Sequence, residues 1–507
     1  MLKSLLADQW VEGTGSGTPI VDATSGAVVD WASTDGLDLG AAVAHARRLG
    51  GSTLRAMSFA DRGKILEALS KATFAARDNL IEVSRQGGTT RGDGKFDIDG
   101  AAGTLAAYAA LGRQLGDGKL LLDGAADNVL RSARFAAQHV WTPRLGVAVH
   151  INAFNFPAWG LAEKLAVAVL AGVPVLTKPA TATAPLAVAL VALWHQSGLL
   201  PPGVLSLVSG GVRDLLDHLG AQDHIAFTGS SETAALLRSH PAVVSRGTRL
   251  NVEADSLNAA VMGPDVEVGS DTFLMFVADV VRDMTQKSGQ KCTAIRRVLV
   301  PAHKVEDVRE ALVDRLSQTV VGDPNVKGTT LGPLSSPSQY ESVRAGAAAL
   351  AAVGTTWWLG SAPEGGCFVA PALFCVLGGV DAPIVHDHEV FGPVATVLPW
   401  SGDAAGAVEI VARGGGGLVA SVYSDDVVWA REVVLGLAPW HGRIHWGSHK
   451  VADQSPGPGT VLPTLVHGGP GRAGGGEELG GERGLRFYWQ RTAVQGDRAL
   501  MERMFGG

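Results

Sequence analysis

The chain has 507 residues, of which 46% are hydrophobic and 18% charged, so it is long enough for two or three globular domains and too apolar to be disordered. Its formal net charge is −7, with 42 Lys and Arg against 49 Asp and Glu and no basic block, which excludes nucleic-acid binding as the main function. Three cysteines are too few for a disulfide framework. Because the sequence also has no secretory signal and no apolar run of about 20 residues, we expect a cytoplasmic protein without a membrane partner.

The spacing of apolar residues predicts the elements in chain order. Helical periodicity predicts helices over residues 40–82, and from Gly146 short apolar runs alternate with amphipathic stretches. We expect strands at 146–151, 173–177, 204–208, 224–227 and 250–253, and helices at 158–170, 184–197, 212–219 and 231–239. Four βα units in a row predict a parallel, doubly wound sheet.

A second α/β segment is expected from about residue 259 to 463. Helices at 273–286 and 304–320 should flank a strand at 296–301. Near the end of the chain, residues 485–494 have the aromatic and β-branched character of a strand.

Two βα turns of the predicted sheet carry polar residues at the carboxyl ends of strands, where ligands bind in doubly wound folds. Lys178, before Pro-Ala-Thr181, could meet a ribose hydroxyl or a phosphate, or could be an ordinary solvated lysine. Thr228-Gly229-Ser230 offers backbone N–H groups at a helix start, which suit a phosphate. An ordinary serine N-cap has the same pattern, so residue types alone leave both alternatives open at each turn.

Cys292 is the candidate nucleophile. Small polar residues in Ser288-Gly-Gln-Lys-Cys-Thr-Ala favour an accessible loop, and Lys291 could lower the thiol pKa. The alternative is an inert buried cysteine, which is our interpretation of Cys367 and Cys375. Glu253 ends a predicted strand 39 residues earlier and could activate water for thioester hydrolysis, or be one of many surface acids.

Two further patterns are weaker. Gly469-Pro-Gly-Arg-Ala-Gly474 matches a dinucleotide fingerprint literally, but that fingerprint needs a strand before it and a helix after it. The glycine tract at 468–484 is expected to be a flexible loop, or to let the backbone approach a neighbouring loop or ligand closely. His386-Asp-His-Glu389 contains metal-ligand residue types, but adjacent residues seldom share a face, so we expect no metal.

Taken together, the motifs resemble those of the aldehyde dehydrogenase superfamily over nearly the whole chain. Six occur in that family's order: Asn155-Phe-Pro, Lys178-Pro-Ala, Phe227-Thr-Gly-Ser, Glu253, Gly289-Gln-Lys-Cys and Glu389-Val-Phe-Gly-Pro. Longer stretches, such as 150–157 and 467–481, are similar to the branch of CoA-linked semialdehyde dehydrogenases of aerobic aromatic degradation. One branch member carries a further hydratase domain, and because this chain stops at Gly507 it resembles the stand-alone form.

The resemblance implies an α/β fold with three parts: a Rossmann-like dinucleotide-binding domain (1–125 and 145–255), an α/β catalytic domain (256–463) and a small β oligomerisation arm (126–144 and 485–507) of a homodimer or homotetramer. It implies that Cys292 attacks the aldehyde, that Asn155 and the Cys292 amide bind the oxyanion, and that Glu253 activates water. The implied cofactor residues are Lys178, Ala180, Thr181, Phe227, Thr228, Gly229, Ser230, Glu389 and Phe391, with Glu389 on the nicotinamide ribose. Relatives that transfer the acyl group to CoA tend to lack the glutamate, so Glu253 favours hydrolysis to a free acid.

Two departures from the family pattern matter. Thr181 stands where many relatives have a glutamate that would repel a 2′-phosphate, so we expect NADP as cofactor, with NAD used less efficiently. The interval between Glu253 and Cys292 is a few residues longer than in common relatives, with the extra residues near 263–270. The expected substrate is a CoA-thioester-linked semialdehyde, first 3,4-dehydroadipyl-CoA semialdehyde of benzoate breakdown. Alternatives are 3-oxo-5,6-dehydrosuberyl-CoA semialdehyde of phenylacetate degradation, a general aldehyde, a CoA-acylating reductase, or a relative without activity.

Overall fold

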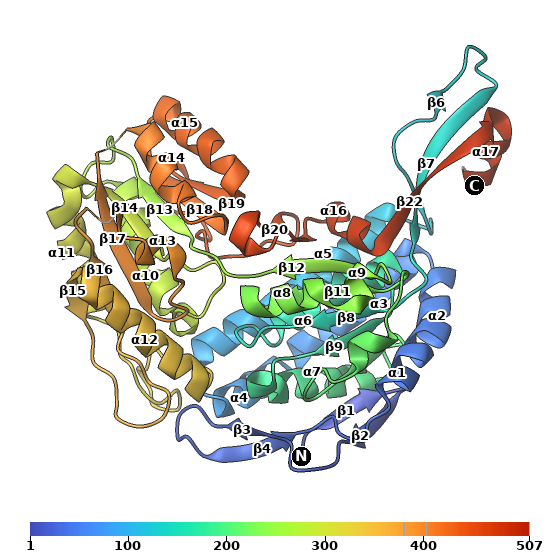
Figure 1. Ribbon diagram of the computed structural model, residues 1–507, viewed down its shortest axis with the longest axis horizontal. Coiled ribbons are helices and arrows are strands. Elements are labelled where there is room, and N and C mark those ends of the chain that lie inside the picture. The colour runs from blue at the N-terminus through green and yellow to red at the C-terminus, as the bar shows by residue number, and fades with distance from the viewer. Residues whose placement is uncertain (379–380, 402, 506–507) are drawn as a thin grey trace.

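The computed structural model describes residues 1–378, 381–401 and 403–505. Residues 379–380 and 402, in the predicted catalytic domain, and 506–507, in the predicted arm, lie outside the described residues. The chain forms two α/β lobes, and a narrow β-ribbon projects away from both (Figure 1). No helix among the described residues is long and apolar enough to cross a membrane.

A seven-stranded sheet organises the first lobe. Its strands, in spatial order, are β12 (Arg249–Glu253), β11 (His224–Thr228), β8 (Ala148–Ile151), β9 (Val175–Lys178), β10 (Leu205–Leu207), β1 (Lys3–Leu6) and β2 (Gln9–Glu12). The first five run parallel, as predicted, while β1 and β2 extend the sheet with antiparallel pairing. The sequence pattern gave no sign of these two N-terminal strands.

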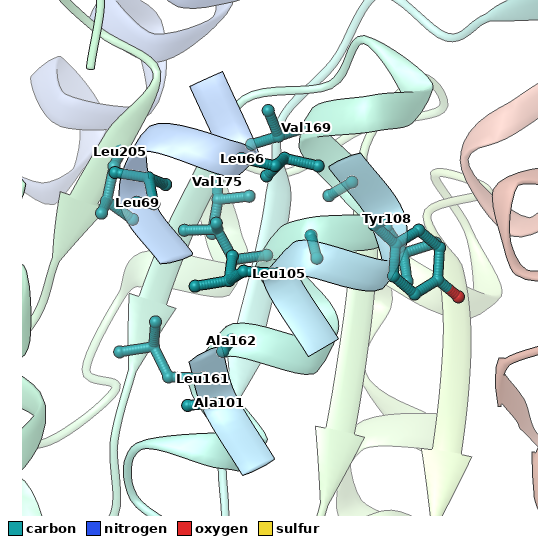
Figure 2. Packing of buried hydrophobic residues seen from close by; sticks show 14 of the residues in the cluster. Leu66, Leu69, Ala101, Leu105, Tyr108, Leu161, Ala162, Val169, Val175 and Leu205 are labelled. Atoms are coloured by element: carbon teal, nitrogen blue, oxygen red, sulfur yellow. The ribbon is translucent and has the colours of Figure 1, made fainter. Parts of the chain in front are cut away.

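Helices cover both faces of this sheet because its strands are apolar on both sides. One face packs against α3 (Phe59–Ala75), α5 (Arg91–Leu115), α6 (Trp159–Ala171) and α7 (Ala184–Gln196), and Figure 2 shows this core around Leu66, Leu105 and Val175. The other face packs against α1 (Leu39–His45) and α8 (Ser231–Ser239). Helices α2 (Gly51–Ala56) and α4 (Arg77–Gln86) also pack on the first of these faces, and α9 (Pro241–Val244) packs on the second. Apart from the sheet, β3 (Thr18–Val21) pairs with β4 (Val28–Ala32).

The second lobe contains another seven-stranded sheet. Its order is β15 (Thr355–Leu359), β16 (Ala372–Cys375), β17 (Val394–Trp400), β14 (Arg297–Pro301), β13 (Ala259–Met262), β18 (Gly417–Tyr423) and β19 (His441–Gly447), with only β15 antiparallel. Helices α10 (Asp271–Thr285) and α11 (Val305–Leu316) pack on one face. Helices α12 (Pro337–Val353), α13 (Ile384–Asp387), α14 (Ala404–Ala412) and α15 (Val427–Leu437) pack on the other.

The projecting ribbon is built from two segments far apart in sequence. Strands β7 (Phe135–Pro143) and β22 (Trp489–Asp497) pair antiparallel over nine residues, and short strands β5 (Leu121–Leu122) and β6 (Asp127–Asn128) join β7 on its other side. Helix α17 (Arg498–Phe505) follows β22 (Figure 1). The strand expected over 485–494 therefore begins later, because α16 (Glu482–Leu485) and a 3-10 turn precede it, and Leu485, Tyr488 and Trp489 are buried in the first lobe.

Three other expectations differ from the structure. The helix predicted at 212–219 is only a 3-10 turn at Leu215–His218, because Gly211 and Gly220 flank a segment too short to propagate a helix. The helix predicted at 304–320 ends at Leu316. The glycine tract is not a loose loop: β20 (Val466–Gly468) and β21 (Glu477–Leu479) form an antiparallel hairpin that crosses between the lobes (Figure 1).

Candidate active site

Cys292 follows a sharply bent loop between the two lobes. Lys287, Ser288 and Gly289 have φ values of 56°, 54° and 68°, so three consecutive residues adopt a left-handed conformation that side chains disfavour. A Cβ at Gly289 would overlap the carbonyl of Gly392, which explains glycine at this position. The loop is held beyond this bend because Asn258 Nδ2 donates to the carbonyl of Cys292 at 2.8 Å.

Four polar side chains from distant parts of the chain meet in one cavity. Cys292, Glu253 and Asn155 line it together with His467, and Phe156 and Trp159 supply apolar walls. The Sγ atom of Cys292 lies 3.7 Å from Nε2 of His467, and the same nitrogen lies 3.3 Å from Oε1 of Glu253. The three catalytic candidates of the sequence are thus close together, and a histidine joins two of them.

The electrostatics of this cluster are dominated by burial. Burial, and then the neighbouring carboxylate of Glu253, raise the pKa of the Cys292 thiol well above its ordinary value. Burial by itself would raise the pKa of Glu253, but the imidazole of His467 outweighs it and the pKa is lowered. For His467 burial would lower the pKa, but the carboxylate of Glu253 outweighs it and the pKa is raised. The Glu253 carboxylate therefore raises the affinity of the imidazole for a proton, and the imidazole lowers that of the carboxylate.

Lys291 does not activate the thiol as the sequence led us to expect. Its ammonium is 1% exposed and lies 2.6 Å from Oδ1 of Asp283, with the Gln286 side-chain oxygen at 3.0 Å. A cation so closely paired exerts little net field on its neighbours. Consistent with this, the pKa of Cys292 is raised, and burial is the first cause.

A second charged cluster adjoins the first. The amine of Lys164, on α6, lies 2.9 Å from Oε2 of Glu478 and 3.6 Å from Oε1 of Glu163, and it donates to Thr228 Oγ1 at 2.8 Å. Burial raises the pKa of Glu163 to about 7, against the opposing effect of Lys164. Carboxylate oxygens of Glu163, Glu253 and Glu478 lie within 4.8 Å of one another, so this cluster continues from Glu253 into the first lobe.

The hairpin β20–β21 carries His467 and Glu478, two residues to which the sequence motifs gave no role. His467 and Glu478 are direct partners in its register, so their side chains share one face of the hairpin. The strand β12 is flanked by the same segment, because Ala254 N donates to the carbonyl of Ala473 and Gly476 N donates to that of Val252, both at 3.0 Å. The close approach expected of the glycine tract is therefore made to the residues on either side of Glu253.

The cofactor candidates surround the carboxyl ends of the first sheet. Lys178 ends β9, and burial lowers the pKa of its amine, for which the described residues provide no carboxylate or hydrogen-bond partner. Ala180 and Thr181 follow at the start of a 3-10 turn. Phe227 is buried in β11, Gly229 N donates to the carbonyl of Glu253, and Ser230 caps α8 by accepting from Thr233 N at 3.3 Å. The serine is thus an N-cap, and the half-buried ammonium of Lys178 lies at the same edge of the sheet.

The second group of cofactor candidates lies on the other lobe. Glu389 Oε2 accepts from the amide of Ser256 at 2.9 Å, while its other oxygen is 3.6 Å from Nε of Arg296. Arg296 also donates to the carbonyls of Gly289 and Gly392 and stacks on Phe391 with its guanidinium 5.3 Å from the ring centre. The arginine therefore joins the loop that precedes Cys292 to the loop that carries Glu389. His386 contacts Arg297 at 3.1 Å.

His467, Lys164, Glu163 and Glu478 were not assigned roles from the sequence. Adjacent Glu163 and Lys164 interrupt an otherwise apolar helix, and that interruption was an available signal. His467 and Glu478 had no comparable signal, because they lie 214 and 225 residues from Glu253 in a glycine-rich tract.

Both the two-lobed fold and the cysteine–glutamate cavity are those of an aldehyde-oxidising enzyme family. The model of the aldehyde dehydrogenase family matches residues 10–494, so the chain belongs to that family, as its motifs predicted. It is an oxidoreductase of a family that uses a nicotinamide cofactor.

Individual relatives agree with this assignment. The chain is 44% identical over 479 residues to the 3,4-dehydroadipyl-CoA semialdehyde dehydrogenase of Aromatoleum evansii, covering 92% of this chain and 93% of that protein. It is 30% identical over 360 residues to the 3-succinoylsemialdehyde-pyridine dehydrogenase of a Pseudomonas species, covering 69% and 70%. In fold it is similar to an NAD-dependent aldehyde dehydrogenase from Sinorhizobium meliloti, with a TM-score of 0.85, 24% identity and coverage of 98% and 94%.

Proposed function

We propose that this protein oxidises a CoA-thioester-linked semialdehyde to the free carboxylic acid with NADP as cofactor. The main observation behind this proposal is the cavity in which Cys292, Glu253 and Asn155 meet at the boundary of the two lobes. The similarity over 92% of the chain to a 3,4-dehydroadipyl-CoA semialdehyde dehydrogenase supports that substrate class. Aromatic breakdown of benzoate type is the corresponding pathway, and the semialdehyde of phenylacetate breakdown is the alternative substrate.

The residues of the cavity account for each step of such an oxidation. The Cys292 sulfur attacks the aldehyde carbon, a C–S bond forms and the carbonyl π pair moves to oxygen. The side-chain amide of Asn155 and the backbone N–H of Cys292 donate to this oxyanion, and one such donor contributes about 3–4 kcal/mol. A bound nicotinamide would accept the hydride from this carbon, so that the oxygen pair re-forms the carbonyl and a thioester remains on Cys292. Glu253 then takes a proton from water, the water oxygen attacks the thioester carbon, and the Cys292 thiolate leaves as the acid is released. The proton on Glu253 is then lost to solvent.

Residues on the first sheet fit the adenosine half of the cofactor. The half-buried amine of Lys178, which has no carboxylate or hydrogen-bond partner among the described residues, suits a ribose hydroxyl or a phosphate. Ala180 and the uncharged Thr181 leave room for a 2′-phosphate next to it, while Phe227, Thr228, Gly229 and Ser230 would approach the rest of the dinucleotide. On the second lobe, Glu389 and Phe391 would hold the nicotinamide ribose, since one oxygen of Glu389 has no hydrogen-bond partner among the described residues.

The first test is a matrix of two cofactors and two substrates. We expect strong reduction of NADP with a CoA-linked semialdehyde, and weak reduction with NAD or with the corresponding free aldehyde. A higher kcat/KM with NAD contradicts the interpretation of Thr181, and equal turnover of free aldehydes contradicts the CoA-linked substrate. Cys292→Ala should abolish oxidation, and a variant that keeps it would refute the mechanism.

Two variants of Thr181 test the cofactor preference. Thr181→Glu introduces a carboxylate near the proposed 2′-phosphate, and repulsion should lower kcat/KM for NADP at least tenfold while NAD is affected less. Thr181→Val removes the hydroxyl without adding charge and serves as the control. If both variants change the two cofactors equally, Thr181 does not set the preference.

A CoA-acylating reductase is the alternative from another class of reaction. It would pass the acyl group from Cys292 to CoA and would not need a general base. Free acid as the product, measured by mass spectrometry in the presence of added CoA, would exclude it, and a new acyl-CoA would support it.

A further inference from the structure

His467 is a third ionisable group at the candidate nucleophile, and the sequence motifs assign it no role. It is 5% exposed, and its Nε2 lies 3.7 Å from Cys292 Sγ and 3.3 Å from Glu253 Oε1. Sulfur hydrogen bonds are long, so the first distance is within reach of an N–H···S or S–H···N contact. One ring nitrogen thus lies between the atom that must lose a proton and a carboxylate that can stabilise the proton's new position.

The site has a difficulty that this geometry resolves. A thiol must ionise before it can attack, yet Cys292 is half-buried beside the carboxylate of Glu253, and both burial and that charge disfavour a thiolate. Lys291, the nearest lysine in sequence, is committed to Asp283. The titratable groups that act on Cys292 in the site are Glu253, His467, Glu163 and Glu389, together with Arg296 and Arg443. The two arginines are already cations and donate to backbone carbonyls, so His467 is the group of this set that becomes a cation on accepting a proton.

We propose that His467 is a catalytic residue that accepts the thiol proton of Cys292, with Glu253 stabilising the imidazolium that forms. This inference rests on the proposed oxidation through Cys292. The S–H bond breaks as an N–H bond forms at Nε2, and the sulfur lone pair is then free to attack the aldehyde carbon. When the thioester is hydrolysed, the departing Cys292 thiolate takes the proton back from Nε2, so His467 returns to its starting state without a net proton.

This arrangement also divides the work between two bases. His467 handles the thiol proton, and Glu253 handles the proton of water. A carboxylate that contacts an imidazolium is a weaker base, so the proton on His467 should slow the attack of water, and it returns to sulfur only when the C–S bond breaks. We therefore expect the acylation and hydrolysis steps to depend differently on the loss of His467.

The test is the pH dependence of Cys292 alkylation by iodoacetamide, followed by mass spectrometry of the Cys292 peptide. Neither aldehyde nor cofactor is needed. For the wild-type protein we expect the rate to level off above an ionisation midpoint, because His467 takes the thiol proton although burial and Glu253 raise the thiol pKa. In His467→Gln and His467→Phe the midpoint should rise by at least one pH unit, which lowers the alkylation rate at pH 7 about tenfold. EDTA should be present throughout, because a thiol, an imidazole and a carboxylate at this spacing also suit zinc.

His441→Gln is the matched control, since His441 is also buried in the second lobe but its ring contacts the carbonyl of Leu437. It should leave the midpoint unchanged. A purely structural role for His467 would lower the rate without moving the midpoint, and that result would overturn the proposal. A wild-type rate that instead rises about tenfold per pH unit without levelling off, as for an unassisted thiol of raised pKa, would overturn it even if the His467 variants failed to fold.

The outcomes separate this inference from the proposed function. An unmoved midpoint together with an inactive Cys292→Ala protein means that His467 is not the proton acceptor, while the oxidation through Cys292 stands. An active Cys292→Ala protein means that the proposed function fails, whatever the alkylation profile. Single-turnover NADPH formation completes the comparison, because His467→Gln should slow this step more than it slows acid release.

Discussion

Lys164 is a buried cation whose partners are all within the site. It is 2% exposed, and it contacts Glu478, Glu163 and the hydroxyl of Thr228. Its removal would leave buried carboxylates without a counter-charge, which is among the costly changes that a protein interior can undergo. Its role is therefore to neutralise the acids that adjoin Glu253.

Lys164→Met should destabilise the protein by about 3–5 kcal/mol in urea unfolding. The stranded Glu478 would escape part of the cost by taking up a proton. Since its folded pKa would then lie above its unfolded pKa, the penalty should be larger at pH 8 than at pH 5. The double variant Lys164→Met/Glu478→Leu should recover part of the loss, because no charge is left unpaired. A loss that is independent of pH would contradict this account.

At the scale of single residues, the sequence indicated the candidate nucleophile, base and oxyanion donor, but not the charged residues around them. Cys292, Glu253 and Asn155 could be named because each stands in a short motif with a definite residue order. His467 and Glu478 could not, because their importance comes from contacts across more than 170 residues. The sign of the thiol pKa was wrong for the same reason, since Asp283 pairs with Lys291 only in the folded structure.

Among the elements, the loop before Cys292 has a strained backbone. Its three left-handed residues end at Gly289, which lies directly against the carbonyl of Gly392. The fold thereby sets the position of the nucleophile relative to the loop that carries Glu389. Arg296 reinforces this by donating to carbonyl groups on both loops.

Gly289→Ala should therefore reduce kcat strongly and lower stability by about 2–4 kcal/mol, the sum of a left-handed penalty and a steric clash. Gly269→Ala is the matched control, because Gly269 has a similar φ of 82° but open space around it. That variant should cost about 1 kcal/mol and leave kcat unchanged. Equal effects of the two substitutions, measured by thermal unfolding and steady-state kinetics, would exclude the clash.

Local patterns predicted the elements well where periodicity is uninterrupted. The parallel strands around His224–Thr228 and helix α6 lie within two residues of their predicted bounds, because an apolar run between turns is a local signal. The hairpin β20–β21 has no apolar periodicity. Its two strands pair with each other, and Gly476 donates a backbone hydrogen bond to Val252 of β12. Strands β1 and β2 were missed because they join the sheet from the far end of the sequence.

At the scale of the whole molecule, the projecting ribbon leaves one edge of β22 without a strand partner among the described residues. Strand β22 pairs with β7 on one edge, and most of its residues are exposed. An unprotected edge strand is a site for pairing with another chain. We therefore keep the prediction that the protein is a homodimer or homotetramer assembled through this ribbon.

A truncation tests that prediction, and the structure determines where to cut. Removal of everything after Gly484 would also delete Trp489, which is 1% exposed and donates to the carbonyl of Ala171, so the first lobe would lose part of its core. Truncation after Gln490 keeps that core. It should give monomers or insoluble protein in light scattering, and a normal active oligomer would rule out the ribbon as the interface.

The position of the hairpin β20–β21 also has a consequence for synthesis. A ribosome makes Glu253 and Cys292 long before His467 and Glu478, so both lobes can emerge while Cys292 still lacks its proposed proton acceptor and Lys164 still lacks one of its carboxylate partners. Until that late hairpin inserts between the lobes, Lys164 has no Glu478 and Cys292 has no nearby imidazole. The growing chain would therefore carry an unreactive cysteine, and the reactive thiolate would form only in a protein that is almost complete.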